Sequence, residues 1–156
     1  MKLAEALAHR SDAVRRVEQL RARVVASARY QEGETPAEDA TRLLVEVDGV
    51  LDELEVLIRR INRTNASVEV GVGTLTDALA RRDVLRLRHA LVTAAADAAA
   101  GRDQRGQAVR QLRSELKMLA ALPVAELRGQ ADRLAREVRE LDMLIQRVNW
   151  EADVLE

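Results

Sequence analysis

Hydrophobic residues recur at steps of three and four along most of the chain, and this period is typical of amphipathic α-helices. Read with the breaks at glycine and proline, the pattern predicts helices at about 3–29, 37–65, 75–100 and 123–150. The last predicted helix has the most regular spacing, with apolar positions at Val124, Leu127, Ala131, Leu134, Val138, Leu141, Ile145 and Val148.

The second predicted helix carries three apolar rows. The main row consists of Leu44, Val47, Leu51, Leu54, Ile58 and Ile61. A second set widens it and consists of Leu43, Val50 and Leu57. Three rows are more than one neighbouring helix normally covers. The pattern therefore predicts a second partner for this helix, and we expect the chain to form a homo-oligomer.

The other two helices have less regular stripes. In the first, Arg10 and Arg21 interrupt the apolar positions, and the third continues into an alanine tract that ends at Gly101. The apolar positions assigned to the first helix are Leu3, Leu7, Val14, Val17, Leu20, Val24 and Ala28, and those assigned to the third are Leu79, Val84, Leu87 and Leu91.

Two of the helix starts resemble capping boxes. Thr35–Glu38, with proline after the threonine, predicts one at the start of the second helix. Thr74 with Asp77 predicts another at the start of the third, and Thr76 is the alternative cap.

A change of period separates the second and third helices. Valines alternate with other residues over 68–72, which predicts a short strand. Residues 107–122 fit either a helix or a strand, and we expect a strand near 115–121 that pairs with 68–72. The predicted fold is mainly all-α: one domain, 1–156, built as an antiparallel bundle of four helices or as elongated hairpins, with this small sheet.

Composition narrows the function classes. The chain has 156 residues, 25 basic and 26 acidic side chains and a net charge of −1, without the basic excess typical of nucleic-acid-binding proteins. Tyr30 and Trp150 are its aromatic residues, too few for base stacking. With no cysteine, no signal-peptide pattern and no apolar run of about 20 residues, we expect a cytoplasmic protein without a membrane span.

Candidate chemistry is concentrated in a polar cassette, Asn62–Asn65 and Gly71–Asp83. The start of the third helix offers free N–H groups and a positive dipole, which suit a phosphorylated small molecule or another anion. The candidate anion-binding residues are Asn62, Arg63, Asn65, Thr76, Asp77, Arg81 and Arg82. Under the alternative interpretation the threonines and aspartate cap the helix, the arginines pair with carboxylates and the asparagines set helix register.

Other polar groups give no reaction centre. Glu5 and His9 lie one helical turn apart and could share a metal, but a dimetal bundle also needs Glu-x-x-His motifs on facing helices, and the sequence contains none. His89 stands among arginines without an evident nucleophile. We therefore assign no catalytic residue, no metal ligand and no cofactor.

Several segments together resemble a small bacterial helical family of unknown function, of which some members are labelled septicolysin. They are Met1–Leu7, Gln31–Glu34, Ile61–Asn65, Thr74–Asp83 and Asn149–Trp150. The label implies a thiol-activated cytolysin, and a chain without cysteine has no thiol to activate. The predicted function is a self-associating structural or interaction module, with an anion- or nucleotide-binding protein, an enzyme included, as the alternative and a cytolysin third.

Overall fold

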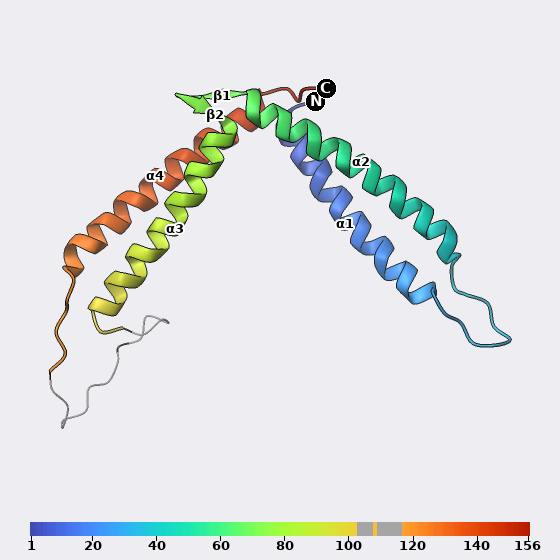
Figure 1. Ribbon diagram of the computed structural model, residues 1–156, viewed down its shortest axis with the longest axis horizontal. Helices are drawn as coiled ribbons and strands as arrows, with labels where there is room; N and C mark the ends of the chain where they lie inside the picture. The colour runs from blue at the N-terminus through green and yellow to red at the C-terminus, as the bar shows by residue number, and fades with distance from the viewer. Residues whose placement is uncertain (103–107, 109–116) are drawn as a thin grey trace. The chain divides into compact units, whose positions relative to one another are not determined.

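The computed structural model describes residues 1–102, 108 and 117–156. This part of the chain forms, in order, α1 (Leu3–Ser27), α2 (Ala40–Ser67), β1 (Glu69–Val70), β2 (Gly73–Thr74), α3 (Leu75–Ala99) and α4 (Val124–Glu151) (Figure 1). The mainly α class with four long helices and one small sheet is confirmed, and the predicted helix ends lie within about three residues of these bounds.

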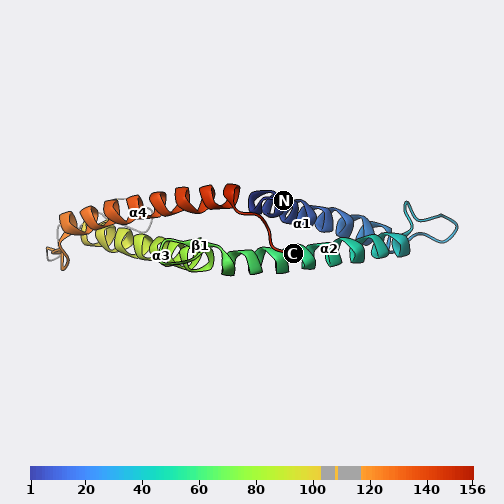
Figure 2. The ribbon, with the colours of Figure 1, turned by 90° about the horizontal axis from the view of Figure 1, so that it is seen from above.

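The chain divides into two compact units. Unit 1 comprises Met1–Leu75 and Gln146–Glu156, and unit 2 comprises Thr76–Ile145. Within unit 1, α1 and α2 form an antiparallel hairpin, and within unit 2, α3 and α4 do the same (Figures 1 and 2). That the whole chain forms a single domain stays a prediction.

The core of unit 1 is a seam between α1 and α2. Leu20, Leu43 and Val50 are buried there, and Ala13, Val17, Val24 and Val47 pack against them. Seven-residue repeats extend the seam, with a break at the exposed Arg10; it consists of Leu3, Ala6, Ala13, Val17, Leu20, Val24 and Ser27 on α1 and of Leu43, Val47, Val50, Leu54, Leu57, Ile61 and Thr64 on α2.

This seam corrects the predicted main row of α2. Leu43 is 5% exposed whereas its neighbour Leu44 is 51% exposed, and Leu51 and Ile58 are also exposed. Because α2 carries three apolar rows, the spacing of its apolar residues does not decide which two rows face α1. The ion pair between Arg16 of α1 and Glu46 of α2 forms in the observed register and favours it.

In α1, part of the predicted apolar stripe was also wrong by one position. Ala6 and Ser27 are buried, and Val14 is 47% exposed. A small residue contributes little to a hydrophobic pattern, yet it allows a neighbouring helix to approach closely. The alanines of α1 therefore face α2 although larger residues stand beside them.

The core of unit 2 lies between α3 and α4. Leu85, Val92, Ala131 and Leu134 are buried together, and Leu127, Val138 and Leu141 pack against them. The apolar repeat predicted for α4 is confirmed by this core, whereas three of the positions predicted for α3 are exposed: Val84, Leu87 and Leu91. Instead, α3 contributes Leu85 and Val92 to this core, and Ala78 and Ala96, on the same side of the helix, are also buried.

The predicted pairing of 68–72 with 115–121 was wrong. β1 pairs with β2 in an antiparallel hairpin, with Glu69 opposite Thr74 and Val70 opposite Gly73. Gly71 has φ +64°, as the first central residue of a type II′ turn requires, so the partner strand is local. Residues 117–121 form no strand, and 115–116 lie outside the described residues.

The helix ends show which residues cap. Asp39, not Thr35, precedes α2, and its carboxylate accepts hydrogen bonds from the backbone N–H groups of Thr41 (3.0 Å) and Arg42 (3.2 Å). The predicted box at Thr35–Glu38 was therefore wrong: the Glu38 carboxylate binds Arg23 of α1 instead of reaching back to the threonine.

The start and end of α3 lie where the sequence placed them. Thr74 immediately precedes the helix and Asp77 lies in its first turn. At the other end Gly101, with φ +74°, donates from its N–H to Ala98 O (3.0 Å), and Arg102 N donates to Asp97 O (2.9 Å). These two bonds form a Schellman motif, which ends the helix at glycine.

Candidate functional site

The Asn62–Asn65 part of the cassette binds residues 155–156. Thr64 is fully buried. Its hydroxyl donates to Arg60 O (2.8 Å) and accepts from the backbone N–H of Leu155 (3.0 Å). The guanidinium of Arg60 donates to Leu155 O (3.1 Å), and that of Arg63 donates to the main-chain oxygen of Glu156 (3.3 Å). The end of α2 therefore binds the final segment of the chain.

The first residues of the chain bind the same segment. Leu3 N donates to Ala152 O (2.9 Å), and Val154 N donates to Met1 O (3.0 Å), an antiparallel bridge. The Lys2 ammonium lies 3.0 Å from Asp153, and its hydrogen bond holds the pKa of that carboxyl below its ordinary value. We call this set of contacts, together with those of Arg60, Arg63 and Thr64, the terminal clasp.

The clasp also explains Glu5. Its carboxylate accepts from the backbone N–H of Lys2 (2.7 Å), at the start of α1. This is the helix-capping use of an acidic residue in the first turn. A metal pair with His9 is therefore not needed to account for the glutamate.

The candidate anion residues are distributed over both units. On α2, Arg63 belongs to the terminal clasp, Asn62 is exposed and Asn65 is half-buried. On α3, Thr76 and Asp77 are exposed in the first turn, and Asp77 takes part in an interaction within the structure. The structure thus gives separate local contacts to the two halves of the cassette.

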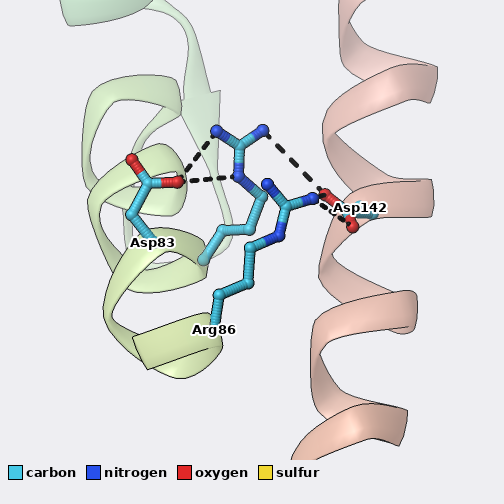
Figure 3. A network of polar contacts seen from close by, with 4 residues as sticks. Asp83, Arg86 and Asp142 are labelled. Carbon is cyan, nitrogen blue, oxygen red and sulfur yellow. Dashed lines mark hydrogen bonds and ion pairs between the residues drawn. The ribbon is translucent and has the colours of Figure 1, made fainter. Parts of the chain in front are cut away.

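Three arginines of α3, Arg81, Arg82 and Arg86, lie near carboxylates, and Figure 3 shows Arg86 pointing at Asp142. Arg82 donates to Asp83 Oδ1 from Nε (3.0 Å) and Nη2 (2.9 Å), and its Nη1 lies 3.9 Å from Asp142 of α4. Arg86 donates to both oxygens of Asp142, at 2.8 and 3.1 Å. Arg81 lies 3.9 Å from Glu137. An anion at Arg82 would have to compete with these carboxylates.

Arg82 and His89 are half-buried, and Arg82 reaches towards Asp142 of α4. An arginine can occupy such a position because its aliphatic stem packs while its head reaches the partner helix. The side chain of Arg82 is 23% exposed and that of Asp142 31% exposed, so this pair lies at the margin of the core. The pairing predicted under the alternative interpretation is therefore present for Arg82 and Arg86.

A hollow of about 450 Å³ lies along the second half of α3. Its described lining includes His89, Thr93, Asp97 and Arg102. Asp97 accepts a 2.5 Å hydrogen bond from Arg128 of α4, so its charge is already balanced. The lining offers no nucleophile with an adjacent base among the described residues.

The two edges of the α1–α2 hairpin differ in chemistry. One edge is closed by ion pairs: Arg16 lies 3.0 Å from Glu46, and Arg23 Nε lies 2.9 Å from Glu38. The hydrogen bond from Arg23 lowers the pKa of the Glu38 carboxyl, and the same contact raises the pKa of Arg23. Oppositely charged residues commonly occupy the positions that flank the seam between two packed helices, and these pairs follow that pattern.

The opposite edge is apolar. In the observed register the seven-residue repeats place Leu7 and Val14 of α1 on the same edge as the exposed row of α2. We call this surface the apolar flank; it consists of Leu7, Val14, Leu44, Leu51 and Ile58. The sequence analysis placed Leu44, Leu51 and Ile58 in the main row of α2, and it did not show that α1 extends this row.

Sequence reasoning missed Thr64 and Asp142 as structural residues. Thr64 follows Leu43, Val50 and Leu57 at seven-residue steps, and this spacing was the available signal for its burial. For Asp142 no such signal exists, because its role depends on which side of α4 faces Arg86.

None of the helices in the described part of the chain is both long and apolar enough to cross a membrane. The model of a family described as "Family of unknown function (DUF6847)" matches residues 10–154. The chain is also similar to a solved structure described as a functionally unknown conserved protein from Corynebacterium diphtheriae, with 40% sequence identity, a TM-score of 0.88 and coverage of 99% of each chain. No curated protein matches the chain.

Proposed function

The chain belongs to the DUF6847 family of unknown function, and we propose that it is a helical module that self-associates through its apolar flank. The observation that carries the proposal is the third row of α2. Leu44, Leu51 and Ile58 are 51%, 43% and 39% exposed although they continue at regular seven-residue spacing beside a buried seam.

The spacing argues for a partner helix. Single exposed hydrophobic residues are normal on a protein surface, but a contiguous row bordered by polar residues is typical of an interaction site. On α2 the row is bordered by Asp48 and Glu55, one turn from its members. A helix that lay against this row would bury it as α1 buries the neighbouring seam.

The anion-binding alternative stays a prediction. The contacts of Arg63, Arg82 and Arg86 account for three of the arginines that motivated it. A membrane-lytic role, which the septicolysin label implies, also stays a hypothesis, as does a location in the cytoplasm. The apolar flank, by contrast, has no partner within unit 1.

Self-association is tested by sedimentation velocity on the full chain at micromolar concentration, with Leu51→Glu as the disrupting variant. We expect the wild type to sediment as an oligomer and the variant to shift towards monomer, because the charge would be buried at the centre of the flank. Val45→Glu is the matched control, since Val45 is an exposed apolar residue of the same helix outside the flank. A monomeric wild type would overturn the proposal.

A further inference from the structure

A second apolar stripe runs along α3, on the side opposite to its core-facing residues. Leu87 and Leu91 are 72% and 70% exposed, and Val84 is 53% exposed. We call this surface the outer stripe; at steps of four and three it consists of Ala80, Val84, Leu87, Leu91, Ala94 and Ala98. A helix that is apolar on two opposite sides is normally packed on both.

Two arginines border one edge of the outer stripe, and Asp77, at the start of this edge, takes part in an interaction within the structure. Arg81 and Arg88 lie three or four residues from Val84 and Leu91, so they share that side of the helix. Arg88 is exposed, and the nearest carboxylate contact of Arg81, to Glu137, is 3.9 Å long. Both arginines are therefore available to a partner with acidic residues.

Acidic residues on the other edge already have partners. Asp83 accepts two hydrogen bonds from Arg82, and Asp97 accepts one from Arg128. The charge that the outer stripe offers to a partner is consequently positive.

The apolar flank of unit 1 has the complementary border. Asp48 and Glu55 lie one turn from its α2 residues, and the contact of Glu55 with Arg59 is 3.8 Å long. On α1, Glu18 is already paired with Arg21 (3.4 Å), so the acidic border is that of α2. Two flanks placed face to face would bring acidic borders together, which disfavours that pairing. A helix with a basic border is the better occupant.

The two surfaces also match in length. From Leu44 to Ile58 the flank spans about 21 Å at 1.5 Å per residue, and the outer stripe from Ala80 to Ala98 spans about 27 Å. The outer stripe is therefore long enough to cover the flank. Its alanines would allow the helices to approach closely.

We infer that the apolar flank of one copy of the chain binds the outer stripe of α3 in a second copy. Arg81 and Arg88 of one copy then lie against Asp48 and Glu55 of the other. The inference rests on the proposed self-association and specifies its surfaces. Because the two surfaces differ, the contact is head-to-tail, and copies assemble into rings or open chains rather than into symmetric pairs.

A head-to-tail contact has a signature that a symmetric contact lacks. Leu51→Glu disables the flank and leaves the outer stripe, whereas Leu87→Glu disables the outer stripe and leaves the flank. Each variant alone is expected to lose more than about tenfold in association. An equimolar mixture is expected to form a one-to-one complex, measured by sedimentation velocity, because one intact pair of surfaces remains.

Charge reversal tests the orientation. One variant carries Asp48→Arg and Glu55→Arg, and the other carries Arg81→Glu and Arg88→Glu. Each should associate weakly with itself, and the mixture should recover a complex. All of the changed residues are exposed, and circular dichroism of each variant verifies that the helices are retained.

Each outcome separates the inference from the proposed function. If the wild type associates but neither mixture forms a complex, the head-to-tail contact is wrong and self-association stands. If the wild type is monomeric, both are wrong. Complex formation by Leu51→Glu with Leu87→Glu and by the reversed pair supports the inference.

Discussion

At the scale of single residues, the terminal clasp assigns a structural role to the Asn62–Asn65 motif. Thr64 uses its hydroxyl twice, as a donor to its own helix and as an acceptor from Leu155 N. Because Thr64 is fully buried, an apolar side chain in its place would leave the part-buried Leu155 N–H without its acceptor, and the loss of such a bond lowers stability. The threonine hydroxyl is therefore expected to be the most sensitive polar group of the clasp.

We predict that Thr64→Val destabilises the protein by about 1 to 3 kcal/mol. Valine keeps the shape of threonine but gives Leu155 N no acceptor. Urea denaturation measures the loss, and hydrogen exchange localises it, since the Leu155 amide should lose protection. Thr64→Ser is the control: it keeps the hydroxyl, so the amide should stay protected. Unchanged exchange at Leu155 in the valine variant would count against the assigned role.

At the scale of elements, the register of α1 against α2 decides which row of α2 is core. Leu43 and Leu44 are adjacent and identical in chemistry, yet 5% and 51% exposed. Comparing substitutions at Leu43 and Leu44 therefore tests the effect of burial alone, because the residue type is the same.

We predict that Leu43→Ala costs about 2 to 4 kcal/mol of unfolding free energy, and that Leu44→Ala costs less than about 1 kcal/mol. The first substitution opens a cavity in the seam, whereas the second removes a side chain that half faces solvent. Thermal or urea unfolding at a concentration where both variants are monomeric provides the comparison. Equal losses, or a larger loss for Leu44→Ala, would favour the register read from the main row.

The same elements show what periodicity determines and what it leaves open. Apolar spacing, Gly101 and Pro123 located all four helices, because these signals act within one turn of the chain. The side of α3 that faces α4 was not predictable in this way, since Ala78 and Ala96 are buried while Leu87 is exposed. Which stripe is covered depends on the partner helix, and a single sequence does not display it.

The candidate site divides in the same way into positions set by local spacing and contacts between residues that are distant in sequence. The positions of Thr74 and Asp77 at the start of α3 were predicted from local spacing, whereas the contacts of Arg63 and Arg82 depend on residues far away in sequence. Arg63 reaches a residue 93 positions later. Such contacts are fixed by the fold, so the sequence marked these arginines as unusual without indicating what they bind.

At the scale of the whole molecule, ion pairs lie at both ends of the α1–α2 hairpin of unit 1. The Lys2–Asp153 pair belongs to the terminal clasp, and the Arg23–Glu38 pair lies next to the connection between the helices. Both carboxyl groups have a pKa that is lower in the folded chain than its ordinary value. Unfolding in acid is therefore linked to proton uptake by these two groups.

We predict that stability is lost as the pH falls, in part through Asp153. Because its pKa is depressed by folding, its contribution is present in full above the unfolded value of about 4 and disappears as the pH falls through the lower folded value. Asp153→Asn should therefore lower stability at pH 7 and flatten the dependence of unfolding free energy on pH, measured by urea denaturation from pH 7 to 3. Lys2→Met removes the cation and should flatten it similarly, and the double variant should add little to either single change. Parallel pH profiles for the wild type and Asp153→Asn would show that the clasp stabilises the protein through its backbone hydrogen bonds rather than through this ion pair.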